Sequence, residues 1–124
     1  MSLWNRKAKT TGLLCGSSRS VKAAILFTTT ASQRDAEILG RALIKKRLAA
    51  CVSVRDGFIS FYEWKGKLQK QKEALILIKS SQEKLSRLEE TLKKIHPYKN
   101  PEFLVLPVSH ASKEYLKWMK EVMV

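Results

Sequence analysis

The order of hydrophobic patterns along the chain constrains its fold more than any other feature. Runs of apolar and β-branched residues, which are typical of strands, alternate with segments whose apolar residues recur at helical spacing. The pattern predicts strands over residues 23–29, 51–62, 74–79 and 103–108. It predicts helices that begin near Ser32, Ser80 and Ser112, the last of them ending at Val122. The order is therefore strand, helix, strand, strand, helix, strand and a final helix.

This order predicts an α+β fold for residues 23–124, a length that suits one domain. Two strand–helix–strand halves on one antiparallel sheet make the ferredoxin-like βαββαβ sandwich, with both helices on one face. The C-terminal helix is an addition to that plan. A serine three residues before an acidic side chain marks a helix start, and two such pairs occur, Ser32 with Asp35 and Ser80 with Glu83.

The second and third predicted strands are joined as a hairpin. Residues 63–67 form the predicted turn, in which Gly66 supplies the backbone conformation with positive φ. The pair Asp56–Gly57 predicts a bulge inside the long second strand. Five large apolar side chains lie on this strand or at its end: Phe58, Ile59, Phe61, Tyr62 and Trp64. They either fill the core of their own chain or pair with another chain, as exposed strand edges tend to do.

The formal net charge of +13 favours anionic partners through long-range attraction. The basic residues mostly alternate with acidic ones on helix exteriors, and no nucleic-acid-binding module is evident, so we expect no nucleic-acid partner. No apolar stretch reaches the roughly 18 residues of a membrane-spanning helix, and we expect no membrane association.

Residues 1–22 carry five basic and no acidic residues and lack sustained periodicity. They are predicted to be a disordered extension, or alternatively an organellar transit peptide. The two cysteines, Cys15 and Cys51, form no CxxC pair, which fits a reducing compartment and predicts a cytoplasmic location if residues 1–22 are no transit peptide. Cys51, at the start of an apolar strand, is expected to be a buried structural thiol.

The run 96–102, HPYKNPE, places an imidazole, a phenol, an ammonium and a carboxylate between a predicted helix and the last strand. Its two prolines predict a rigid connection, because proline cannot continue a helix and restricts the preceding residue. Rigid connections of this kind often carry functional groups. The alternative is an ordinary helix end with solvated polar side chains.

Three segments in this order closely resemble the signature segments of the CutA family of divalent-ion tolerance proteins. They are residues 48–52 (LAACV), 62–67 (YEWKGK) and 96–102 (HPYKNPE), and the resemblance runs from about residue 23 to 123. It implies a ferredoxin-like protomer in a tight homotrimer, whose long hairpin extends past its own sheet and pairs with neighbouring protomers. It also implies an association with copper or another divalent cation.

The resemblance implies His96 as the candidate metal ligand. Where bacterial relatives can have a cysteine and a second histidine, this chain has Thr28 and Ile95. Tight copper sites usually gather several nitrogen or sulfur donors, so we expect weak binding and no obligatory cofactor. His110 could contribute a second imidazole, although a solvated side chain is the simpler expectation.

Four further residues are candidates for a ligand-binding cleft between protomers: Lys67, Lys79, Tyr98 and Glu102. Two ammoniums, a phenol and a carboxylate could hold an anionic or zwitterionic ligand; the alternative is a structural ion pair with surface charges. The family also resembles the trimeric PII-type sensors in architecture. A second functional hypothesis is a trimeric scaffold that binds a protein partner without a metal role. We expect no enzymatic activity, because no catalytic constellation or phosphate-binding loop is evident.

Overall fold

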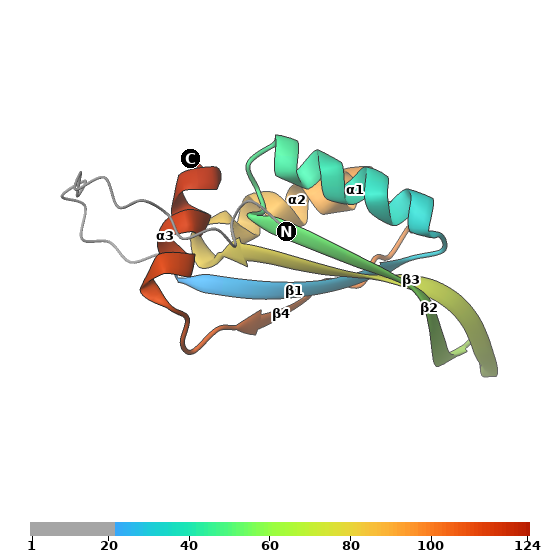
Figure 1. Cartoon of the computed structure of the whole chain (residues 1–124). Coiled ribbons are helices and arrows are strands. Elements are labelled where there is room, and N and C mark those ends of the chain that lie inside the picture. The colour runs from blue at the N-terminus through green and yellow to red at the C-terminus, as the bar shows by residue number, and fades with distance from the viewer. Residues whose placement is uncertain (1–21) are drawn as a thin grey trace, which may run out of the picture.

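A four-stranded antiparallel sheet in the order β2-β3-β1-β4 carries the fold, as the computed structural model shows (Figure 1). The structure describes residues 22–124, so the predictions for Cys15 and for residues 1–21 lie outside it. The strands are β1 (Ala23–Thr30), β2 (Cys51–Trp64), β3 (Lys67–Ser81) and β4 (Leu104–Pro107), and the helices are α1 (Gln33–Lys45), α2 (Leu85–Ile95) and α3 (Lys113–Val122). The predicted ferredoxin-like α+β fold is confirmed.

The main core lies between the sheet and the two helices that cover one of its faces (Figure 1). Helix α1 contributes Leu39 and Leu43, α2 contributes Leu88 and Leu92, and all four are 2% exposed or less. Every second residue of the central strands meets them, because side chains alternate between the faces of a sheet. A smaller cluster around Met119 packs α3 against one end of the sheet. None of the helices between residues 22 and 124 is long and apolar enough to cross a membrane.

The helix starts confirm two of the three serine signals and correct one. The Ser32 side chain accepts a hydrogen bond from the Asp35 amide at 3.1 Å, and Ser112 caps α3 in the same way. The start predicted at Ser80 is wrong. Its hydroxyl is buried at the end of β3 and donates to the Leu48 carbonyl at 2.7 Å, while a 3₁₀ turn over Gln82–Lys84 leads into α2. The Ser80 hydroxyl is therefore bonded to the Leu48 carbonyl and does not cap the helix.

The predicted hairpin turn and bulge are both confirmed. Lys65 and Gly66 form a two-residue turn with φ of 52° and 75°, the conformation that matches the twist of the flanking strands. The strand register shifts between Arg55 and Phe58, where Gly57 has φ of 86°. Strand β3 begins at Lys67 rather than at the predicted Ala74. Its first residues pair with β2 outside the body of the protein and lack a hydrophobic pattern, so the sequence did not mark them as a strand.

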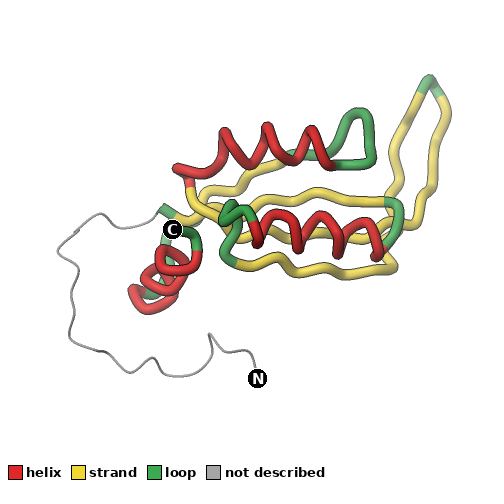
Figure 2. The backbone as a smooth tube through the Cα atoms, turned by 90° about the horizontal axis from the view of Figure 1, so that it is seen from above, coloured by secondary structure: helices red, strands yellow, loops and turns green. Residues whose placement is uncertain are grey.

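Beyond the bulge the hairpin projects away from the helices (Figure 2). Phe61 is 63% exposed and Trp64 59% exposed, so neither belongs to the core of its own chain. Cys51, expected to be buried, is only half-buried, because β2 is an edge strand of the sheet. The last strand is also shorter than predicted by one residue at each end.

Candidate functional site

The connection after α2 passes the end of β1 and reaches the root of the hairpin. His96 caps α2 in an extended conformation, with φ of −72° and ψ of 134°, and its side chain is 6% exposed. Proline at position 97 favours this extended backbone. The helix ends at Ile95, before Pro97, as expected because proline cannot continue a helix, and the turn brings His96 and Tyr98 beside each other.

Both ring nitrogens of His96 are hydrogen-bonded within the chain. The Tyr98 amide donates to Nδ1 at 3.0 Å, so Nδ1 carries no proton. The proton is therefore on Nε2, which donates to the Thr29 carbonyl at 2.8 Å and lies 3.2 Å from the Thr28 hydroxyl. Burial lowers the pKa of His96, and it outweighs the Thr29 carbonyl and the negative charges of Asp35 and Glu73. The ring is neutral, with its tautomer set by these contacts.

Tyr98 joins this connection to the hairpin. Its hydroxyl donates to Glu73 Oε2 at 2.7 Å, a charge-assisted hydrogen bond, and its ring lies 4.9 Å from that of His96. Burial and the Glu73 carboxylate hold the pKa of Tyr98 well above its usual value. The phenol therefore stays protonated and acts as a donor.

Glu73 is the site residue that the sequence analysis missed. It is 7% exposed and pairs with Phe58, the first residue after the bulge. Burial alone would raise the pKa of Glu73, but hydrogen bonds from Tyr98, Ser60 and Thr29 lower it below its usual value. The only signal in the sequence was an acidic residue directly before the apolar run ALILIK.

Of the four predicted cleft residues, the structure brings two to this region. Tyr98 contacts Glu73 directly. Glu102 lies close enough that partial burial, together with the Glu73 charge, raises its pKa. The other two lie elsewhere: Lys67 follows the hairpin turn opposite Trp64, whereas Lys79 pairs with Cys51 at the other end of β3.

The two lysines are twelve residues apart on one strand, about 40 Å when measured along the strand. Lys79 is six residues, or about 20 Å, from Glu73 on the same strand. One chain therefore does not assemble the four residues into one site. A shared site would need Lys67 or Lys79 from another protomer.

Comparison with known proteins places the chain in a family. The family model described as "CutA1 divalent ion tolerance protein" matches residues 24–122, which is most of the chain. The chain belongs to the CutA1 family. The predicted resemblance is thereby confirmed, and divalent-ion tolerance is the role that the family's description names.

Two CutA relatives and one solved structure illustrate the likeness. The "Divalent-cation tolerance protein CutA" of Thermus thermophilus is 36% identical, over 78% of this chain and 94% of that protein. "Protein CutA, chloroplastic" of Arabidopsis thaliana is also 36% identical, over 84% of this chain but only 57% of that protein's length. The crystal structure of CutA1 from Oryza sativa is 33% identical and has a TM-score of 0.81, covering 83% of this chain and 94% of that chain.

The family's name implies a divalent ion, and the donors around His96 do not fit one. A neutral imidazole has one ring lone pair to offer a metal, and that of His96 accepts the Tyr98 amide. The Thr28 hydroxyl lies 3.2 Å from Nε2 of the same ring. Between residues 22 and 124 no group of three or more His, Cys, Asp or Glu side chains could hold a metal ion. His110 is exposed, as expected for a solvated histidine.

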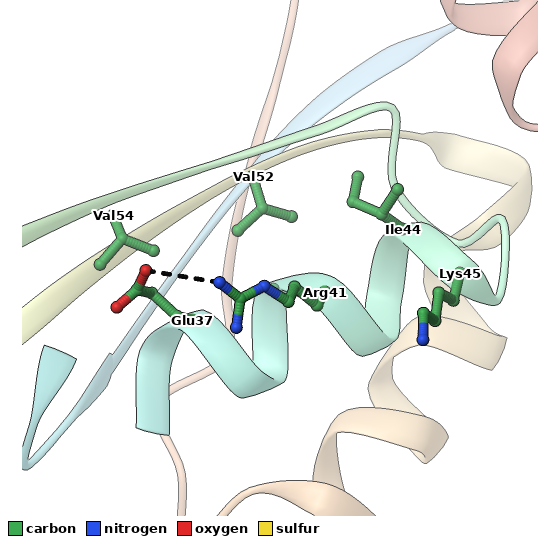
Figure 3. Close-up of a pocket in the computed structure, with 7 residues that line it drawn as sticks. Glu37, Arg41, Ile44, Lys45, Val52 and Val54 are labelled. Carbon is green, nitrogen blue, oxygen red and sulfur yellow. Dashed lines mark ion pairs between the residues drawn. The ribbon is translucent and has the colours of Figure 1, made fainter. Parts of the chain in front are cut away.

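A groove of about 500 Å³ lies away from this cluster, between α1 and β2 (Figure 3). Its lining residues are Glu37, Gly40, Arg41, Ile44, Lys45, Val52 and Val54. A Cβ at Gly40 would lie 3.0 Å from Val52 Cγ1, so glycine allows the helix to approach the strand closely. The ion pair between Glu37 and Arg41, at 3.8 Å, is exposed and adds little stability. None of the predicted site residues lines this groove.

Proposed function

We propose that the chain is a non-enzymatic divalent-ion tolerance protein that acts as a homotrimer and binds a small ligand or ion at clefts between protomers. The family's description and the names of its relatives support the ion-related role. It would have no obligatory cofactor and would bind a divalent ion such as copper weakly, because soft donors are few in this sequence. The observation that carries the proposal is the amount of apolar surface that a single chain leaves uncovered.

One such surface is the face of the sheet opposite α1 and α2. Phe27 lies beside Leu104 and Ile25 beside Leu106, and the two leucines are 58% and 53% exposed. Leu77, the neighbour of Phe27 on β3, is half-buried. A face of this kind is stable in water when a second surface covers it, and contiguous exposed apolar patches mark interaction sites.

The second surface is the distal half of the hairpin, residues 58–72. Phe61 and Trp64 are largely exposed there, and aromatic side chains are favoured anchors of protein interfaces. Tyr62 lies near enough to Tyr98 to influence its pKa, so this half of the hairpin begins beside the candidate site. Other copies of the chain that cover it would place their side chains close to Tyr98, Glu73 and Glu102.

Light scattering after size exclusion tests the trimer. We expect a particle of three times the 14.2 kDa chain mass. Phe61→Lys should shift the protein towards the monomer, because it places a charge inside the proposed interface. Ile38→Lys is the matched control: Ile38 is 55% exposed on α1, and its substitution should leave the trimer intact. A monomeric wild-type protein would contradict the trimer and, with it, the clefts.

A thermal-shift screen with divalent ions and small anions separates ligand binding from the scaffold hypothesis. A ligand that binds the folded state raises its midpoint of unfolding. A rise with at least one compound supports the binding role. A trimer that responds to none of them supports a scaffold for a protein partner.

For the location, we propose the cytoplasm, with an organelle as the alternative. The Arabidopsis relative is named chloroplastic, which supports the alternative for a chain with a basic, acid-free N-terminal stretch. A fusion of residues 1–22 to a fluorescent protein distinguishes the two locations, because a transit peptide would carry the fusion into an organelle.

A further inference from the structure

His96 is nearly enclosed and uses both ring nitrogens inside its own chain. We propose that His96 is a positioning residue that fixes the backbone of residues 96–98 so that Tyr98 meets Glu73, and that it does not ligate the divalent ion. The second part rests on the proposed divalent-ion function; the first part stands on the geometry alone.

The hydrogen bonds at the ring are incompatible with a metal ligand in this arrangement. Binding through Nδ1 would displace the Tyr98 amide, and binding through Nε2 would displace the Thr29 carbonyl and shift the ring proton to Nδ1, which could then no longer accept from the Tyr98 amide. Either change leaves a part-buried backbone group without its partner, which is costly. The ring would also have to turn out of a pocket in which it is 6% exposed.

The same hydrogen bonds give the residue a positioning role. The Nδ1 acceptor holds the Tyr98 amide, and the Nε2 donor ties the ring to Thr29 at the end of β1. Tyr98 is thereby held with its hydroxyl 2.7 Å from Glu73 Oε2. Three segments far apart in sequence are joined in this way: the end of α2, the end of β1 and the start of the distal hairpin.

Glu73 extends this chain of contacts to the hairpin. It pairs with Phe58, the first residue beyond the bulge, where β2 and β3 leave the body of the protein. A carboxylate held by Tyr98 at this point restrains the direction in which the hairpin projects. His96 therefore acts on the proposed inter-protomer surface through Tyr98 and Glu73, without touching a ligand.

The wild-type protein provides the first test, by long-range ¹H–¹⁵N NMR of the two histidines. We expect His96 to be neutral with the proton on Nε2, and its ring ¹⁵N shifts to stay unchanged when Zn²⁺ is added in excess. His110, exposed and outside the cluster, is the internal control for non-specific binding. A Zn²⁺-dependent change at His96, or an Nδ1-protonated ring, would overturn the proposal.

Variants then separate positioning from ligation. His96→Asn keeps an acceptor near the position of Nδ1, whereas His96→Ala keeps none. Hydrogen-exchange protection of the Tyr98 amide should fall about tenfold or more in His96→Ala and be largely restored in His96→Asn. Equal protection in all three proteins would contradict the positioning role.

Calorimetry with Cu²⁺ completes the test, with His110→Ala as the matched variant. We expect Cu²⁺ affinity in His96→Asn to stay within about threefold of wild type, and a loss of tenfold or more would show that His96 is a ligand. If the wild-type protein binds neither Cu²⁺ nor Zn²⁺, the divalent-ion function fails. The ring tautomer and the Tyr98 protection still decide the positioning role in that case.

Discussion

The two halves of the β2–β3 hairpin have similar strand pairing but opposite surroundings. In the basal half, Ala74, Ile76 and Ile78 are fully buried under α1 and α2. In the distal half, Leu68 is 78% exposed and Phe61 63% exposed. The difference teaches that one chain completes the core of the basal half only and leaves the large side chains of the distal half exposed, which is the basis of the proposed contacts with other chains.

The His96–Tyr98–Glu73 cluster lies at the boundary between the halves. Glu73 comes directly before the buried Ala74, and its cross-strand partner Phe58 comes directly after the bulge. This cluster satisfies its hydrogen bonds within the chain, as the basal half satisfies its packing. The boundary is therefore where an internally complete structure meets the exposed surface that we propose other chains cover.

The largest effect is expected from a substitution in the basal half. Ile76→Ala removes a fully buried side chain and should lower the free energy of unfolding by about 2–5 kcal/mol, the usual cost of a core cavity. Urea unfolding at fixed protein concentration measures it. Leu68→Ala, in the distal half, should cost far less in a protein held as monomer by Phe61→Lys. Similar losses at both positions would remove the distinction between the halves.

A smaller effect is expected at the boundary. Tyr98→Phe removes the hydrogen bond to the buried Glu73 carboxylate and should cost about 1.5–3 kcal/mol of unfolding free energy. A double-mutant cycle with Glu73→Gln isolates the pair. Additive losses would mean that Tyr98 and Glu73 do not depend on each other.

Acidification tests the same boundary through His96. Because its folded-state pKa lies below the unfolded value, the unfolded chain binds the proton first, and stability falls as the pH drops through about 6.5. Glu73 adds a second loss at lower pH, as the pH falls below about 4.5. Urea midpoints from pH 8 to pH 5 measure the first loss, which should be reduced in His96→Asn. A midpoint that is flat in wild type over this range would contradict the buried neutral ring.

The smallest effect is expected at an exposed ion pair on α1. Arg41→Ala breaks the exposed ion pair with Glu37 and should change the unfolding free energy by no more than about 0.5 kcal/mol. This variant calibrates the comparison. A loss above about 1 kcal/mol of unfolding free energy would indicate that Arg41 makes a stabilising contact at this groove beyond its exposed ion pair with Glu37.

The sequence predicted the features that depend on local patterns. Strand and helix order followed from periodicity, and Gly57 and Gly66 marked the bulge and the turn because both need a positive φ. Ser80 misled because its hydroxyl serves the Leu48 carbonyl, 32 residues away in sequence.

The candidate site depended on contacts between distant segments and was predicted only in part. Glu73 was missed because its partner, Tyr98, lies 25 residues further along the chain. His96 was singled out from its segment as a candidate metal ligand, but no local pattern shows that Thr28 and Thr29, almost 70 residues earlier, contact its ring. The metal-binding role that the family resemblance implied for His96 stays a prediction. The geometry supports the positioning role that we propose in its place.

Hydrogen exchange of the wild-type protein and Phe61→Lys tests the central claim most directly, because it reads both sides of the boundary at once. The account predicts that the variant loses protection at the amides of residues 58–72, where other chains would cover the hairpin, while the Tyr98 amide keeps its protection. Equal protection of residues 58–72 in the two proteins, or a matching loss at Tyr98, would contradict it.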